Sequence, residues 1–87
     1  MKHKTKINGY ETMDELCEEI GNLRYDSLAD FLKLLRDKLA NDSDKDLKRG
    51  RQKLAAELFY ASCRIKEASE SIRTAWEISK PYIDLKG

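Results

Sequence analysis

The chain has 87 residues, 38% of them charged, and its 17 Lys and Arg residues nearly balance its 16 Asp and Glu residues. A chain of this length is one domain that buries about 60–65% of its unfolded surface, so its core is marginal without a metal, a disulfide or a second chain. The balanced charge excludes a strong global field for nucleic acid or membranes, and apolar runs of at most four residues exclude a membrane-spanning helix.

Residues 1–11 are predicted to form a mobile basic tail ahead of a single helical domain at residues 12–87. Lys2, Lys4 and Lys6 favour solvent, and the residues that follow include a turn signal, Asn-Gly. No apolar stretch follows the lysines, so we do not expect a signal peptide. The two cysteines are far apart, which indicates reduced thiols and a cytoplasmic location.

Two short amphipathic helices are predicted next. The first starts with Thr12 as its cap and Glu15 completing a capping box, and Gly21-Asn22 supplies a left-handed stop. The second starts with Ser27 as its cap and ends at Asn41. The apolar face of the first consists of Met13, Leu16, Cys17 and Ile20, and that of the second of Leu28, Phe31, Leu32, Leu35 and Leu39.

A long helix is predicted from about Asp44 to Ser79, because apolar or small residues recur there in alternating steps of four and three. Small residues run down one edge of this heptad seam and would let a partner helix approach closely. Gly50 marks either a bend or the true start of the helix. The predicted dimer or partner interface consists of Leu58, Ala61, Ile65, Ala68, Ile72, Ala75 and Trp76, with Ala55, Ser62 and Ser69 beside it.

Residues 42–53 place three alternate aspartates before five cations and invite comparison with a calcium loop. Such a loop needs glycine at its sixth position and glutamate at its twelfth, where this chain has Leu47 and Lys53. We therefore expect no calcium site. A helix start explains the aspartates, with Ser43 as the cap and Asp46 in the first turn.

The five cations are not explained by a helix start, because positive charge in a first turn opposes the helix dipole. Three interpretations stay open: a solvated face without a specific partner, pairing with the acidic first helix within or between chains, and binding of an anion or nucleic acid. No aromatic residue lies within 42–53 to stack on a base. This candidate patch consists of Lys45, Lys48, Arg49, Arg51 and Lys53.

No catalytic constellation can be assembled from the remaining residues, so we do not expect an enzyme, a cofactor or a metal site. His3 is the only histidine and lies in the tail. Cys17 is expected to be a buried structural thiol. Cys63 clusters on the long helix with Ala56, Phe59 and Tyr60, and this second patch is either core, which we favour slightly, or a contact surface.

The sequence predicts an all-α fold of two short helices and one long C-terminal helix, a small bundle completed by dimerisation. The expected function is a non-enzymatic helical module for protein–protein interaction or assembly. Its partners would be a second copy of itself, through the long helix, and an unidentified protein. The alternative is a small nucleic-acid or polyanion-binding protein that uses residues 45–53.

Overall fold

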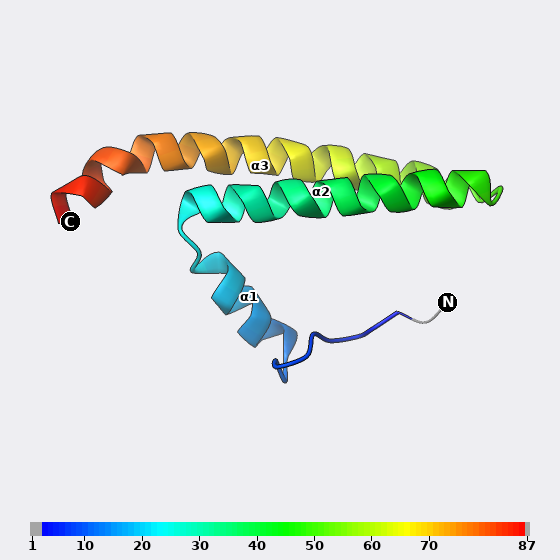
Figure 1. The fold of residues 1–87 in the computed structure, drawn as a ribbon, viewed down its shortest axis with the longest axis horizontal. Coiled ribbons are helices and arrows are strands. Elements are labelled where there is room, and N and C mark those ends of the chain that lie inside the picture. The colour runs from blue at the N-terminus through cyan, green and yellow to red at the C-terminus, as the bar shows by residue number, and fades with distance from the viewer. Residues whose placement is uncertain (1–2, 87) are drawn as a thin grey trace.

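The computed structural model describes residues 3–86, and in this range the chain forms three α-helices and no strand (Figure 1). Helix α1 spans Met13–Gly21, α2 spans Tyr25–Lys48 and α3 spans Gln52–Lys86. The all-α prediction is confirmed. Residues 1, 2 and 87 of the predicted tail and domain lie outside the described range.

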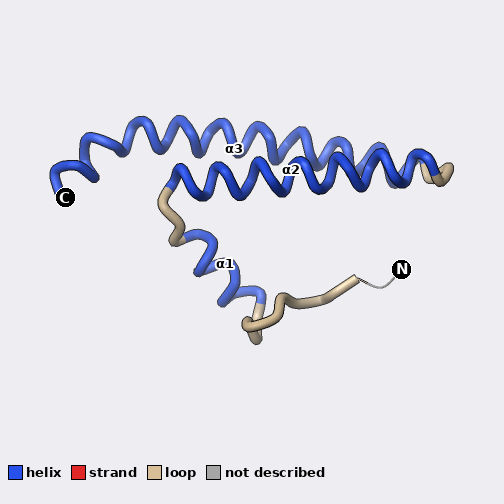
Figure 2. The backbone as a smooth tube through the Cα atoms, viewed as in Figure 1, coloured by secondary structure: helices blue, strands red, loops and turns tan. Residues whose placement is uncertain are grey.

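Helices α2 and α3 run antiparallel and make the one extensive helix–helix contact among the described residues (Figure 2). The chain measures 53 × 29 × 13 Å, and its radius of gyration is 16.1 Å. A compact chain of this length has a radius of gyration of about 12 Å. The three helices therefore form an extended single layer, with α1 projecting from the start of α2 (Figure 1).

The contact between α2 and α3 is built from small residues. Ala29 and Ala55 are the buried apolar residues in the part of the chain whose side chains are described. Ser43 Oγ donates a 2.6 Å hydrogen bond to the carbonyl of Ala55, and Ser69 Oγ donates a 3.1 Å bond to the carbonyl of Ala29. Because the residue numbers of both pairs add to 98, they define one antiparallel register along the whole hairpin.

The second helix is longer than predicted, since it continues through Asn41 to Lys48 over 24 residues. The connection lies at residues 49–51, so the predicted helix start near Asp44 is wrong, and Gly50 lies two residues before the true start at Gln52. Gly50 adopts a φ of 81°, a left-handed conformation that glycine tolerates best.

The turn at Gly50 is a Schellman motif. The N–H of Arg51 donates to the carbonyl of Asp46 at 2.9 Å, and the N–H of Gly50 donates to the carbonyl of Leu47 at 3.0 Å. These two bonds satisfy carbonyls that a helix end otherwise leaves unpaired. The helix continues past Asn41 because the next residues, Ser43 and Asp46, are buried between α2 and α3.

The predicted caps of the two N-terminal helices are partly confirmed. Thr12 Oγ1 accepts a 3.2 Å hydrogen bond from the N–H of Glu15. The left-handed stop is wrong, because Asn22 caps α1 in a right-handed conformation with φ −86°. The Ser27 cap is also wrong: α2 starts at Tyr25, and the N–H of Ser27 donates instead to Asp26 Oδ1 at 2.9 Å.

Candidate functional site

The predicted interface residues of α3 separate into two groups. Leu58, Ile65 and Ile72 lie half-buried beside α2 of the same chain. Of the alanine edge, Ala68 is exposed, whereas Ala61 and Ala75 are half-buried. The contact of α3 with α2 uses the neighbouring edge of Ala55, Ser62 and Ser69. The packing of a second copy on the alanine edge stays a prediction.

One flank of the hairpin is apolar along its length. The leucine stripe of α2 lies beside the residues of α2 that contact α3. The alanine edge of α3 lies beside the residues of α3 that contact α2. In an antiparallel pair, these equivalent heptad positions lie on one side. None of the apolar residues on this side of the hairpin is fully buried. We call this surface the apolar flank, and it consists of Leu28, Leu32, Leu35, Leu39, Leu58, Ala61, Ile65, Ala68, Ile72 and Ala75.

The second patch is a surface rather than core. Phe59 is 54% exposed and Tyr60 51% exposed, and their rings lie 6.3 Å apart in a tilted arrangement. Cys63 is half-buried next to them. The preference for core is therefore wrong, because α1 makes no extensive contact with α3 and α2 packs on a different edge of α3. The alternative of an exposed contact surface fits the structure.

The basic cluster lies at the tip of the hairpin, around the connection between α2 and α3. Only Arg51 is paired within the described residues, with Asp46 at 3.3 Å. The acidic helix α1 lies at the opposite end of α2 (Figure 1). Pairing of the cluster with α1 within one chain is therefore wrong, while pairing between chains stays open. These tip cations are Lys45, Lys48, Arg49, Arg51 and Lys53.

The three aspartates lie on the last turns of α2 and not in a loop or at a helix start. Asp42 accepts a 2.6 Å bond from Lys38, and this hydrogen bond holds the pKa of its carboxyl below the ordinary value. Asp46 is buried and faces Arg51. Within residues 3–86 no group of three or more His, Cys, Asp or Glu residues is placed to hold a metal ion.

Two cationic side chains lie near one indole ring at the end of the hairpin where α1 joins α2. The Arg24 guanidinium lies 5.1 Å and the Lys80 ammonium 5.8 Å from the ring centroid of Trp76, within the range of cation–π attraction. Arg24 also pairs with Asp26 at 2.7 Å, and this hydrogen bond lowers the pKa of the Asp26 carboxyl. Trp76 is half-buried at this junction.

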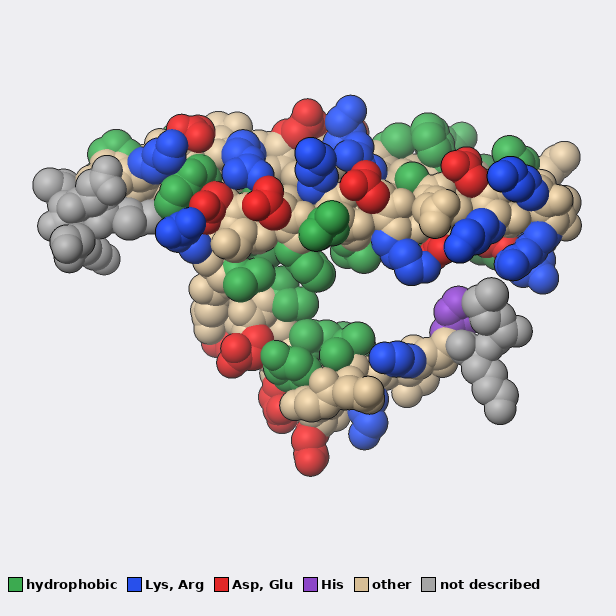
Figure 3. All heavy atoms as spheres, in the orientation of Figure 1, with side chains coloured by type: hydrophobic (Ala, Val, Ile, Leu, Met, Phe, Trp, Pro, Cys, Tyr) green, Lys and Arg blue, Asp and Glu red, His purple; other side chains and the backbone are tan. Residues whose placement is uncertain are grey.

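Helix α1 leaves its apolar side uncovered. Cys17, expected to be buried, is exposed, and Met13 is also exposed. The reason is that α1 makes no extensive contact with the hairpin. Figure 3 shows hydrophobic side chains of α1 gathered on the side that looks toward α2.

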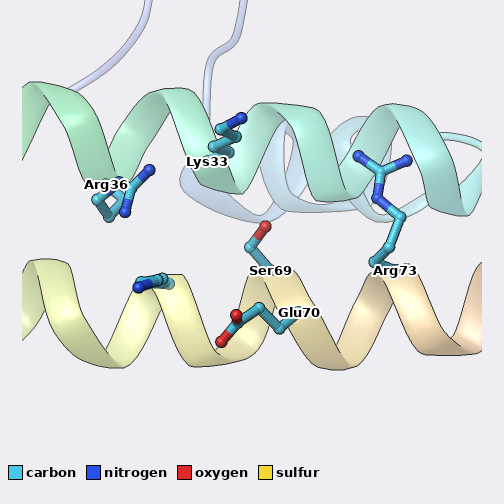
Figure 4. Close-up of a pocket in the computed structure, with 6 residues that line it drawn as sticks. Lys33, Arg36, Ser69, Glu70 and Arg73 are labelled. Atoms are coloured by element: carbon cyan, nitrogen blue, oxygen red, sulfur yellow. The ribbon is translucent and has the colours of Figure 1, made fainter.

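A basic groove lies between α2 and α3 on the flank opposite the apolar one. Its volume is about 330 Å³. Figure 4 shows Arg36 between the two helices, Arg73 reaching from α3 toward α2, and Lys33 lying over α2 at the rim of the groove. The groove was not predicted from the sequence, although the seven-residue spacing of Lys66 and Arg73 indicates that both lie on one side of a helix. The groove is lined by Lys33, Arg36, Lys66, Ser69, Glu70 and Arg73.

None of the helices described here combines the length and the apolar character needed to cross a membrane. No family model matches this chain, and no curated protein or solved structure is significantly similar to it.

Proposed function

We propose that this chain is a non-enzymatic helical interaction module that assembles as a homodimer through the apolar flank of its hairpin. The observation that carries the proposal is the small core. Ala29 and Ala55 are the buried apolar residues among those whose side chains are described, and every leucine, isoleucine and aromatic residue there keeps part of its surface in water. Burial of large apolar side chains is the main favourable contribution to folding, so the hairpin needs a cover.

The apolar flank has the dimensions of a stable interface. Over the 24 residues of α2, it is about 36 Å long at 1.5 Å per residue. Two helices about 9 Å apart give it a width near 18 Å, so each copy offers roughly 650 Å². A standard interface buries about 800 Å² per partner. A second hairpin packed on the flank would form a four-helix arrangement, and a two-fold axis would match the flank to itself.

The charge distribution favours two copies that run in opposite directions. The basic tip lies at one end of the hairpin and α1 projects from the other (Figure 1). A two-fold axis perpendicular to the hairpin would bring each tip to the end that carries the partner's acidic helix. Complementary charges of this kind set orientation and register more than affinity. The acidic residues in and next to α1 are Glu11, Asp14, Glu15, Glu18 and Glu19.

The test is the mass in solution of the wild type and of Ala68→Arg. Ala68 is exposed on the apolar flank, so an arginine there is tolerated by the single hairpin but places a charge inside the dimer contact. Light scattering after size exclusion is expected to give twice the 10.1 kDa chain mass for the wild type and a single chain mass for Ala68→Arg.

The matched control is Thr74→Arg, which places the same side chain on an exposed position of α3 away from the apolar flank. It should keep the mass of the wild type. A wild-type mass of 10.1 kDa at tens of micromolar would contradict the proposal, as would equal dissociation of both variants. Phe59→Glu, within the second patch, tests that surface: dissociation by this change alone would move the contact away from the apolar flank.

A further inference from the structure

We propose that the basic groove between α2 and α3 is a binding site for a small phosphate anion with two or three phosphate groups. Four of its six lining residues are cations and one is an acid. The groove lies on the flank opposite the proposed dimer contact, so this inference does not depend on that contact.

Arg36 occupies an unusual position for a charged residue. It lies seven residues after Ala29 and seven before Ser43, both buried in the helix contact, and the register places it opposite Ser62, which is 2% exposed. Arg36 Nε is buried. Asp37 Oδ1 lies 2.6 Å away and forms an ion pair with the guanidinium, but it does not accept a hydrogen bond from Nε. A buried donor without an acceptor costs free energy, which an anion in the groove would offset.

Two lysines stand on facing turns of the groove. Lys33 lies one turn beyond Ala29, and Lys66 lies about one turn from Ser69 in the same direction, because the helices are antiparallel. Neither lysine makes a salt bridge within the part of the chain whose side chains are described. Like charges that line one groove repel each other, and an anion between them converts that repulsion into attraction.

The other residues that line the groove limit the kinds of ligand that it can bind. Arg73 reaches across to Asp30 at 2.6 Å and closes one end of the groove. Ser69 Oγ donates its hydrogen to the carbonyl of Ala29, so it offers no donor to a ligand. Recognition therefore rests on cations alone. No aromatic residue lines the groove, so a base or another ring has nothing to stack on.

The groove has room for a small ligand. Its volume of about 330 Å³ lies at the lower end of the range for small-molecule pockets, about 300–1,000 Å³. A chain of two or three phosphates carries enough charge to engage several cations at once. The same phosphate chain occurs free or as part of a nucleotide, and the groove offers contacts to the phosphates in either case.

The experiment is calorimetric titration of the full chain with inorganic triphosphate at about 0.15 M salt, where long-range attraction is largely screened. We expect binding with a dissociation constant below about 1 mM. Lys33→Met combined with Lys66→Met should weaken it about tenfold or more. Lys48→Met combined with Lys53→Met removes the same charge from the hairpin tip and should change it less than about twofold.

A second measurement separates a binding role of Arg36 from a structural one. Arg36→Met keeps the aliphatic length and removes both the buried Nε and its ion pair with Asp37, so the Tm of the variant is measured first without ligand. Triphosphate should raise the Tm of the wild type and leave that of Arg36→Met unchanged. Adenosine triphosphate should bind as tightly as free triphosphate if phosphates alone are recognised, whereas much tighter binding would identify a nucleotide as the source.

Several outcomes would overturn the site. They are absence of binding at about 1 mM triphosphate, equal weakening by the groove and tip variants, equal affinity for sulfate, or a ligand-induced rise in Tm that Arg36→Met retains.

Discussion

At the scale of single residues, serine hydroxyls set how close the two long helices come. Ser43 is buried and donates to the carbonyl of Ala55, and Ser69 makes the equivalent bond to Ala29 at the other end of the hairpin. A serine is small enough for close backbone approach, and its hydroxyl bonds a carbonyl on the facing helix. The contact therefore depends both on small side chains and on hydrogen bonds between the helices. A larger side chain at these positions would push the helices apart.

Replacing Ser43 by Leu is expected to destabilise the hairpin by about 1–3 kcal/mol, because the extra carbon atoms do not fit the contact. Ser43→Ala removes only the hydrogen bond and should cost about 0.5–1.5 kcal/mol. Urea unfolding followed by circular dichroism measures both. Ser71→Leu is the control, since Ser71 is exposed on α3. Equal stability of the two leucine variants would contradict the proposed close contact.

At the scale of secondary-structure elements, the turn at Gly50 decides that α2 and α3 form a hairpin. The Schellman bonds end α2, and the left-handed glycine reverses the chain direction within three residues. Arg51 then pairs with Asp46 across the turn. The helix pair is therefore joined by a short connection with defined hydrogen bonds, which fixes the register of the small-residue contact on either side.

Gly50→Ala is expected to lower the free energy of unfolding by about 1–2 kcal/mol, the cost of a left-handed conformation for a residue with a Cβ. No atom lies within 4 Å of the position of that Cβ, so the effect is conformational and not steric. Gly21→Ala is the matched control, because Gly21 lies in α1 without a positive φ and its Cβ position is also open. It should be neutral or stabilising. The same loss in both variants would argue against the left-handed turn.

At the scale of the whole molecule, one layer of helices presents two different flanks. The apolar flank carries leucine and alanine side chains, and the opposite flank carries the basic groove. Figure 3 shows Lys, Arg, Asp and Glu side chains over much of the hairpin face that it draws. A dimer through the apolar flank would leave the groove open on both outer surfaces, so assembly and anion binding would be compatible.

Reversing Lys48 and Arg49 to Glu is expected to weaken self-association about threefold to tenfold at low salt, since it replaces attraction to the partner's α1 by repulsion. Arg51 is left unchanged because it pairs with Asp46 in its own chain. Sedimentation at two salt concentrations measures the effect, which should shrink as salt rises. Combining the change with Glu15→Lys and Glu18→Lys should restore association. Failure of this rescue would contradict the antiparallel orientation.

The sequence by itself determined the helical class, the cap at Thr12 and the apolar stripes, because helix periodicity and capping are local properties of the chain. It did not decide where the second helix ends. Asn41 and Gly50 are competing stop signals of similar local strength. The helix continues past Asn41 since Ser43 donates to the carbonyl of Ala55 on α3 and Asp46 pairs with Arg51 in the connection, and both partners come within reach only once the chain has folded back.

Only the tertiary structure decided which edge of α3 makes the close contact. The edge of Ala61, Ala68 and Ala75 and the edge of Ala55, Ser62 and Ser69 both repeat every seven residues and both carry small side chains. Residue size therefore does not separate them. The serine edge packs on α2 because the hydroxyl of Ser69 and that of Ser43 on α2 each reach a carbonyl across the contact, and that register also brings Lys33 and Lys66 to one groove.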